Sequence, residues 1–354
     1  MADLPSSLTT WLDAQADALD DGQLDADLVL PRLADAGMLG IGVDPAQGGA
    51  GGRVGDAVDA LARVAEHSLT AAFVLWGQRT FIAYLGHTDN PALRARLLPS
   101  LLRGELAGAT GLSNAIKFLS RLEELQVRGE PAGDGEVRLH GRLPWVTNLR
   151  KRGFVAAFAV DHGGVAAPSI YAVPSDAAGL ARSADLELLA MQASNTAALS
   201  FDGVQLSDAH RLHADARAFL RAVRPEFLAL QCGLAVGLTR RALRETEACG
   251  GESRAVLQDE TAALARENAA RFDALIAGTE SGAFLHEPAR LFALRIRLAE
   301  LSAAAVSLEV QARGGRGYLR AHCAGLARRR REAAFVPIVT PSLVQLRAEL
   351  RSAT

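Results

Sequence analysis

Residues 135–160 read GEVRLHGRLPWVTNLRKRGFVAAFAV, and they open the part of the chain in which the hydrophobic pattern is β-like. Polar and apolar residues alternate over 136–140, and a turn is expected at Gly141. Short runs rich in aliphatic and aromatic residues follow at 143–148, 154–160, 169–173 and 197–201. Because Gly, Asp and Pro separate these runs, they predict the strands of an antiparallel sheet or a small barrel.

Helical patterns lie on both sides of this β region. Before it, helices are expected at 54–65, 68–84 and 91–102. After it, the chain is helical from Arg217 to the end, with one buried stripe formed by Leu291, Leu294, Leu298 and Leu301. We therefore expect a mostly α protein with an N-terminal helical domain (1–107), a middle antiparallel β domain (108–208) and a C-terminal four-helix bundle (209–354). Long apolar helices of this kind also bury surface against other subunits, so a homodimer or homotetramer is expected.

The composition argues against several kinds of partner. The 354 residues include 38 basic and 40 acidic side chains, and a formal charge of −2 does not favour nucleic acid or an anionic membrane. The run Arg328–Arg331 is therefore interpreted as a structural or phosphate-facing helix end. Three scattered cysteines indicate reduced thiols. Since neither a secretory signal nor a membrane-spanning apolar run is visible, we expect a cytoplasmic protein without a membrane partner.

Several motifs, in the same order, resemble the acyl-CoA dehydrogenase family of flavoproteins. Residues 33–49 resemble the family's N-terminal signature, and Trp145-Val146-Thr147-Asn148 resembles its flavin-contacting tetrapeptide. Residues 311–318, QARGGRGY, resemble its Gln-x-x-Gly-Gly-x-Gly-Tyr motif. The resemblance covers nearly the whole chain. It implies the same three-part fold, with FAD between the β domain and the bundle.

The resemblance also implies which residues contact FAD. Trp145 would pack against the flavin ring, and Thr147 would offer its hydroxyl to the N5 edge of the flavin. Without the resemblance, Trp145 would be interpreted as an ordinary core aromatic residue. Glycines such as Gly314 and Gly315 would let the backbone come close to the cofactor. The other cofactor contacts implied in this way are Leu112, Ser113, Gln311 and Ser342.

The chain departs from the family at the catalytic base. Thr340 stands where most members have the glutamate that removes the substrate α-proton, and a threonine hydroxyl has no accessible conjugate base near neutral pH. Some members carry the base about ten residues before a Gly-Leu-x-x-x-Ala-Leu run, which is 237–243 here. Glu226 lies one residue, about 100° around a helix, from that position. It is therefore either a relocated base or a solvated glutamate. No metal site is expected, because His210 and His213 have no accompanying metal-binding motif.

Two further family features are missing, and three functions stay open. The Arg-x-x-Phe-Gly stretch that reaches a neighbouring subunit's FAD is deleted between 243 and 257, and residues 115–120 replace an Ala-Gly-Ser-Asp loop near the CoA moiety. The first function is an FAD-dependent acyl-CoA dehydrogenase-like oxidoreductase acting on a small molecule or thioester. The second is a flavin-dependent monooxygenase or oxidase. The third is a catalytically silent binding homologue.

Overall fold

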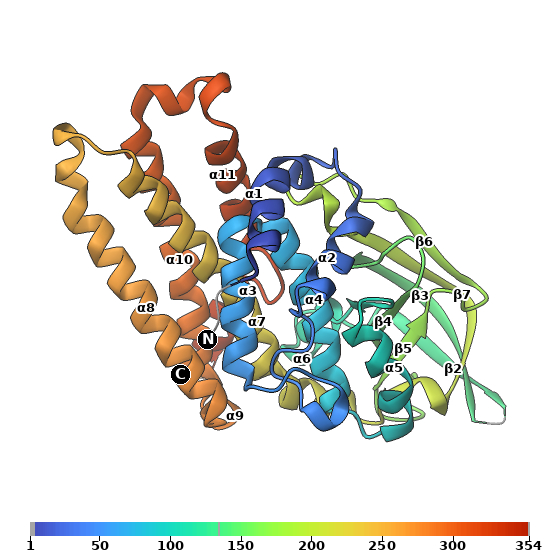
Figure 1. Ribbon diagram of the computed structural model, residues 1–354. Coiled ribbons are helices and arrows are strands. Elements are labelled where there is room, and N and C mark those ends of the chain that lie inside the picture. Colours follow the sequence, from blue (N-terminus) through green and yellow to red (C-terminus); the bar gives the residue numbers. More distant parts are fainter. Residues whose placement is uncertain (1–3, 134, 353–354) are drawn as a thin grey trace.

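A computed structural model describes residues 4–133 and 135–352. Helices come first, two small sheets follow, and long helices complete the chain, which confirms the predicted fold class. In Figure 1 the N-terminal helices lie between the sheets and the long C-terminal helices. The pocket described below lies in this central region.

Five helices make up the N-terminal part. They are α1 (Ser6–Asp21), α2 (Val29–Asp35), α3 (Val54–His67), α4 (Leu69–Gly86) and α5 (Pro91–Leu102). The predicted helices correspond to α3, α4 and α5. Helix α4 begins where the Ser68 hydroxyl accepts a hydrogen bond from the Ala71 amide, and its side chains are buried on all faces. It is therefore a central helix, which packs against the other N-terminal helices and against β1 (Ala107–Thr110) of the first sheet described next.

The β region forms two four-stranded sheets. In the first sheet the strand order is β1 (Ala107–Thr110), β4 (Phe154–Val160), β5 (Ser169–Pro174) and β8 (Arg211–His213). In the second it is β2 (Val127–Gly133), β3 (Glu136–Val146), β7 (Ala197–Ser207) and β6 (Leu180–Asp185). All neighbouring pairs are antiparallel except β1 and β4. Helix α6 (Ser113–Leu119) follows β1.

The turn predicted at Gly141 is wrong, because β3 runs through this residue to Val146. Gly141 has φ of 144°, and a β-carbon there would lie 2.2 Å from the carbonyl oxygen of Gln126, which precedes β2. The glycine thus permits close approach of the backbone at the start of β2. Because β3 continues, Trp145 lies near the end of this strand, one residue before Val146.

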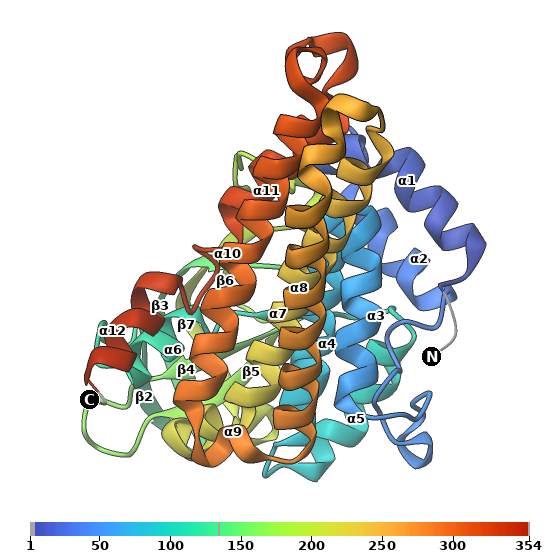
Figure 2. The same cartoon turned by 90° about the vertical axis from the view of Figure 1, so that its left-hand side faces the viewer.

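The C-terminal part contains three long helices, with shorter helices packed beside them. Figure 2 shows the long helices side by side. The long helices are α7 (Ala216–Ala248), α8 (Gln258–Glu280) and α10 (Pro288–Arg313); α9 (Ala283–His286) connects the last two. Helices α11 (Ala324–Phe335) and α12 (Leu343–Ser352) both contact α10. The predicted leucine stripe on α10 is buried. Gly237 lets α7 approach α3 closely, since a β-carbon there would lie 2.0 Å from the carbonyl oxygen of Ala62.

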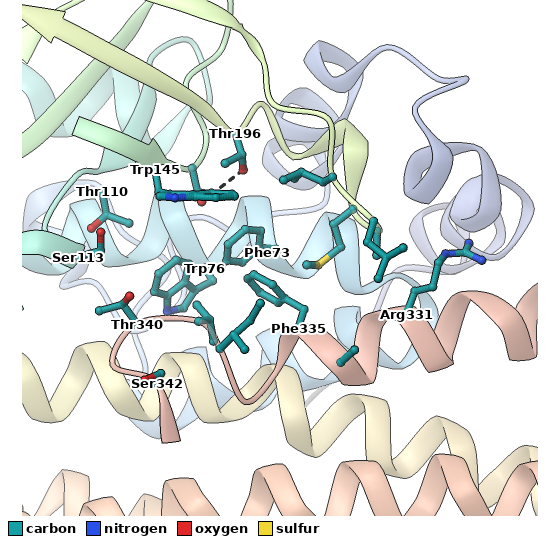
Figure 3. A pocket seen from close by; sticks show the side chains of 18 of the residues that line it. Phe73, Trp76, Thr110, Ser113, Trp145, Thr196, Arg331, Phe335, Thr340 and Ser342 are labelled. Carbon is teal, nitrogen blue, oxygen red and sulfur yellow. Dashed lines mark hydrogen bonds between the residues drawn. The ribbon is translucent and has the colours of Figure 1, made fainter. Parts of the chain in front are cut away.

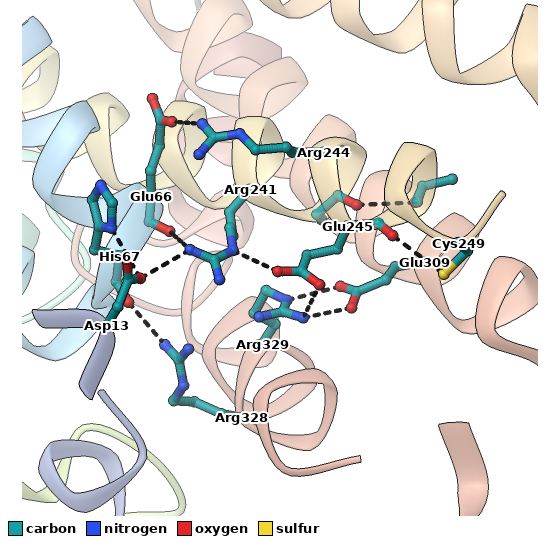
Figure 4. A network of polar contacts seen from close by, with 12 residues as sticks. Asp13, Glu66, His67, Arg241, Arg244, Glu245, Cys249, Glu309, Arg328 and Arg329 are labelled. Carbon is teal, nitrogen blue, oxygen red and sulfur yellow. Dashed lines mark hydrogen bonds and ion pairs between the residues drawn. The ribbon is translucent and has the colours of Figure 1, made fainter. Parts of the chain in front are cut away.

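Ion pairs join the N-terminal helices to the bundle (Figure 4). Asp13 of α1 contacts His67 at 2.9 Å and Arg241 of α7 at 3.1 Å. Although burial alone would raise it, the pKa of Asp13 is lowered by hydrogen bonds and charge from these two partners. The arginines at 328, 329 and 331 pair with Asp17, Glu309 and Asp20 respectively. These three side chains therefore have a structural role, as the sequence interpretation allowed.

Across the described ranges, none of the helices is long and apolar enough to cross a membrane. Within the same ranges, no cluster of three or more His, Cys, Asp or Glu side chains is arranged to hold a metal ion.

Candidate functional site

A pocket of about 520 Å³ lies where α4, α7, the strand ends and the segment after α11 meet (Figure 3). Its lining comes from every part of the chain, from Phe73 on α4 to Ser342 before α12. Most of the lining is apolar. The polar groups are concentrated on the side formed by the sheets, and charged groups lie at its rim.

The wall formed by the sheets presents hydroxyl groups. An isolated β-bridge joins Thr110 and Thr147, and both residues line the pocket. The Thr196 hydroxyl donates to Thr147 Oγ1 at 3.4 Å, and it lies 2.8 Å from Ser194 Oγ. Thr110 Oγ1 lies 2.8 Å from the hydroxyl of Tyr84. Because burial raises the pKa of Tyr84, its phenol is neutral and this wall carries no charge.

Trp145 stands beside these hydroxyls with its indole over the pocket (Figure 3). Successive side chains of a strand point to opposite faces, so Val146 enters the core while Trp145 faces outward. The Trp145 side chain is 57% exposed, whereas Val146 is fully buried. Trp145 is therefore not a core aromatic residue, and it offers a large flat surface to a ligand.

Two buried amides hold this wall in place. Asn148, which follows Thr147, adopts φ of 61°, in the left-handed region where asparagine is tolerated. Its Nδ2 donates to the Gly108 carbonyl oxygen at 2.9 Å and to Gln78 Oε1 at 3.1 Å. Gln78 Oε1 also accepts from the Gly108 amide at 2.7 Å. Helix α4 thus fixes β1 and the end of β3 relative to each other.

Aromatic side chains form the opposite wall. Phe73 and Trp76, one turn apart on α4, stack with ring centroids 5.3 Å apart. Phe335 of α11 meets Phe73 edge-on at 4.8 Å, and Phe227 of α7 meets Trp76 edge-on at 5.2 Å. Edge-on and offset contacts of this kind stabilise aromatic clusters. They give the pocket a rigid apolar side that excludes water.

The segment from Val336 to Ser342 closes the pocket between α11 and α12. Thr340 and Ser342 line the pocket, and the backbone carbonyl of Thr340 accepts a hydrogen bond from Gln231 Nε2 at 2.9 Å. Among the described residues of the lining, the one carboxylate is Glu187, which is exposed at the rim. No described carboxylate therefore faces the interior beside Thr340.

The two cations at the rim are paired. Arg331 forms an ion pair with Asp20 at the end of α1, and Lys117 pairs with Glu123 at 2.6 Å. Asp20 is buried, and its Oδ1 also accepts a hydrogen bond from the backbone amide of Met191 at 2.8 Å. Met191 and Arg331 both line the pocket, so Asp20 connects two sides of the rim.

The structure brings together five of the residues suggested by the sequence, which are Ser113, Trp145, Thr147, Thr340 and Ser342. Leu112 is fully buried beside Ser113 and does not line the pocket. Glu226 also lies outside the lining, with its carboxylate 3.7 Å from His87, while its neighbour Phe227 faces the pocket. The one-residue offset noted in the sequence therefore directs Glu226 away from the pocket.

The glycine-rich motif lies elsewhere. Gln311, Gly314 and Gly315 are at the end of α10 and in the 3-10 turn that follows it, and none lines the pocket. Figure 2 shows the connection between α10 and α11 projecting beyond the sheets. Within one chain, this motif is separate from Trp145 and Thr147.

Sequence reasoning missed the aromatic wall and Asp20. Helix α4 is buried on all faces, so its pattern gives no amphipathic stripe to show that Phe73 and Trp76 face a cavity. Two long polar side chains, Gln78 and Arg79, interrupt this mostly apolar helix, and they are the sign in the sequence that it packs against polar groups. Both are buried, and burial lowers the pKa of Arg79 to about 10. Nothing in the local sequence distinguishes Asp20 from Asp21.

The residues of the pocket fit a flavin. A flat ring with polar atoms along its edges needs an apolar surface and hydrogen-bonding groups beside it, and Trp145 and the Thr147 hydroxyl offer these on one wall. Thr110 and Ser113 add hydroxyls on the same side (Figure 3). The aromatic wall leaves an apolar space for a second molecule.

Comparisons with known proteins agree with this fit. The family model for the acyl-CoA dehydrogenase N-terminal domain matches residues 10–105. A benzylmalonyl-CoA dehydrogenase from Aromatoleum aromaticum is 27% identical in an alignment 247 residues long that covers 67% of this chain. The aligned part spans 63% of that relative's length, which is less than two thirds.

Two solved structures have the same fold. Butyryl-CoA dehydrogenase from Megasphaera elsdenii superposes with a TM-score of 0.83 at 16% identity, over 100% of this chain and 99% of that one. FMN-bound TdsC from Paenibacillus sp. A11-2 superposes with a TM-score of 0.82 at 16% identity, over 97% and 94%. At such identities the likeness shows a common fold.

Proposed function

We propose that this chain, as a member of the acyl-CoA dehydrogenase family, is a flavin-dependent oxidoreductase that acts on a small apolar molecule. The observation that carries this proposal is the exposed indole of Trp145 beside the Thr147 hydroxyl, over an apolar pocket. A bound flavin supplies transfer of hydride or electrons, which side chains alone do not supply. FAD is the form implied by the family resemblance, and FMN is the form bound to TdsC.

The side chains would divide the work between the two walls. Trp145 would hold one face of the flavin ring, and Thr147 would donate a hydrogen bond to its edge, with Ser113 and Ser342 beside it. Phe73, Trp76 and Phe335 would pack against the substrate and exclude water.

Reconstitution tests the proposal directly. We expect the purified protein to bind FAD or FMN, with a visible flavin spectrum and a higher melting temperature. Trp145→Ala removes an exposed side chain, so it should leave the fold intact and weaken flavin binding roughly 2- to 10-fold. Trp11→Ala, on α1 and outside the pocket lining, is the matched control. A protein that stays colourless with both flavins would instead support the silent binding homologue.

A second candidate function, a flavin-dependent monooxygenase or oxidase, is favoured by Thr340. Removal of an α-proton from a thioester needs a general base within roughly 2.6–3.2 Å, directly or through one water. The Thr340 hydroxyl does not meet this need, and Glu226 lies outside the pocket lining. We therefore expect short-, medium- and branched-chain acyl-CoA thioesters to bleach the flavin slowly under anaerobic conditions. Rapid bleaching would support the dehydrogenase, whereas fast reoxidation of reduced flavin by oxygen would support the second candidate.

We also propose a homodimer or homotetramer. Tyr318 and Leu319, next to the glycine-rich motif, are 85% and 57% exposed, and such apolar surface is usually covered. Because Gln311, Gly314 and Gly315 lie outside this chain's pocket, they would contact a flavin only across a subunit interface. Light scattering that gives a monomer mass at micromolar concentration would contradict this proposal.

A further inference from the structure

Two buried side chains from the bundle hold the segment that closes the pocket. This segment joins α11 to α12, and it contributes Ile338, Val339, Thr340 and Ser342 to the lining. Arg295 of α10 reaches its beginning, and Gln231 of α7 reaches Thr340. Neither side chain lines the pocket itself.

The contacts form one continuous chain of hydrogen bonds through Arg295 and Gln231, which is called the relay below. Arg295 Nη2 donates to the Val336 carbonyl oxygen at 2.5 Å, and Arg295 Nε donates to Gln231 Oε1 at 2.9 Å. Gln231 Nε2 then donates to the Thr340 carbonyl oxygen at 2.9 Å. The carbonyls of Val336 and Thr340 lie four residues apart in the chain. The relay therefore fixes both ends of the part of the segment that carries Ile338 and Val339.

Stability alone is a poor explanation for this arrangement. Arg295 is 0% exposed and Gln231 is 1% exposed. In the part of the chain that the structure describes, no carboxylate is paired with Arg295, and its Nη1 has no hydrogen-bond partner. Burial lowers the pKa of Arg295, because the charged form is poorly solvated there. Replacing a buried charge with an apolar side chain is often neutral or stabilising, so the cation is better explained by what it positions.

We propose that Arg295 and Gln231 are positioning residues, which set the backbone of residues 336–340 and thereby place Thr340 against the ligand. This inference rests on the proposed function for the identity of the ligand. The relay itself is a property of the chain and can be tested without a cofactor. Its distinguishing feature is that the two side chains act through backbone carbonyls, so the side chain at position 340 is left free.

Gln231→Glu separates positioning from stability. The carboxylate would give Arg295 the ion-pair partner that it lacks, but it cannot donate a hydrogen bond to the Thr340 carbonyl. We therefore expect a variant at least as resistant to urea as the parent, with an altered pocket. Gln231→Met removes the same donor without adding a charge, and it replaces Gln231→Glu if that variant does not fold.

The readout uses the three tryptophans of the chain, which are Trp11, Trp76 and Trp145. In protein labelled with 5-fluorotryptophan, each gives a fluorine NMR signal. Trp76 lies over the segment in Figure 3, so its signal should shift in Gln231→Glu, while Trp11, outside the pocket lining, should keep its position. FAD affinity, measured separately by fluorescence titration, should fall roughly 3- to 10-fold, as for the loss of one hydrogen bond.

The outcomes distinguish this inference from the proposed function. Unchanged Trp76 signal and FAD affinity in Gln231→Glu would overturn the inference, even if the parent binds flavin well. Movement of all three signals together with lower urea resistance would also overturn it, because the role would then be structural. If the parent binds no flavin, the proposed function fails, and a shift confined to the pocket tryptophans would still support the relay.

Discussion

Replacing Gln78 with leucine tests how the hydroxyl wall of the pocket is held. Gln78 is fully buried on α4, and leucine is similar in size but lacks the amide. The amide makes four hydrogen bonds. Its Nε2 donates to the carbonyl oxygens of Leu101 and Leu106 at 2.8 and 3.0 Å, and its Oε1 accepts from Gly108 N and Asn148 Nδ2 at 2.7 and 3.1 Å.

The expected loss of stability can be worked from these contacts. Leaving the buried Gly108 amide without an acceptor costs about 1–3 kcal/mol. The Leu101 carbonyl keeps its bond from the Gly104 amide, so the two carbonyl contacts together contribute about 1–3 kcal/mol. Added apolar surface from leucine offsets about 1 kcal/mol. The net destabilisation is therefore about 1–5 kcal/mol.

Urea unfolding followed by circular dichroism, at fixed pH and protein concentration, measures this change. Gln258→Leu, an exposed position in the first turn of α8, is the matched control and should change stability by less than about 0.5 kcal/mol. Because Asn148 follows Thr147, flavin affinity should fall in Gln78→Leu as well. A loss below about 1 kcal/mol with unchanged flavin affinity would refute the reasoning, since the amide would then not hold the wall.

Three further substitutions test other contacts. Asp20→Asn leaves Arg331 without its anionic partner, so we expect the free energy of unfolding in urea to fall by about 1–3 kcal/mol. The control is Asp21→Asn, at an exposed position, which should cause no measurable fall. Equal effects would contradict the role given to Asp20. Gly237→Ala should separate α7 from α3 and lower the free energy of unfolding by about 1–3 kcal/mol or more. Gly86→Ala is the control, because a β-carbon there meets nothing within 4 Å, and it should not destabilise the protein. Similar melting temperatures for both variants would show that the close approach is unimportant. Burial raises the pKa of Glu332, and the charge of Arg328 offsets this only in part, so the folded state favours the neutral acid. The stabilisation from Glu332 is therefore greatest below its ordinary pKa of 4.5 and is lost as the pH rises through the folded value. Glu332→Gln should then be more stable than the parent at pH 7 and equal to it below pH 4.5, and the opposite trend would contradict this sign.

The sequence predicted those strands whose pattern is visible locally. Strand β4 is a run of seven apolar residues and was predicted with its observed bounds. Strand β1, Ala107–Thr110, has four small residues and no pattern, and it exists because α4 and β4 cover it on two sides. Strand β2 contains Pro131 and Gly133, which disfavour a strand in isolation. Pairing with β3 overcomes that preference, and this pairing cannot be seen in the residues of β2 alone.

The same distinction applies to the pocket. Trp145 and Thr147 are close in the sequence, so a four-residue motif was enough to identify them together. Phe73 and Phe335 meet only because α4 and α11 pack against each other, over a separation of 262 positions in the chain, from 73 to 335. The sequence can suggest that each is buried, but it does not say that their rings share a wall. Glu226 lies one residue from the position that the family pattern indicates, and this offset places its carboxylate beside His87 and not in the pocket lining.

The distribution of charge explains why a neutral ligand suits this pocket. Its inner polar groups are hydroxyls, and the two cations at the rim, Arg331 and Lys117, are already paired with Asp20 and Glu123. An anion entering the aromatic side would lose its hydration and find no free cation among the described lining residues, and a cation would find the one carboxylate of the lining, Glu187, only at the exposed rim. In either case the loss of hydration costs several kcal/mol. A neutral molecule loses little hydration and gains contact with Phe73 and Trp76. The same reasoning applies to a base, since a carboxylate placed near Thr340 would have its pKa raised by burial. A hydroxyl at position 340 is therefore consistent with chemistry that depends on the flavin and excluded water, and not on proton removal by a buried anion.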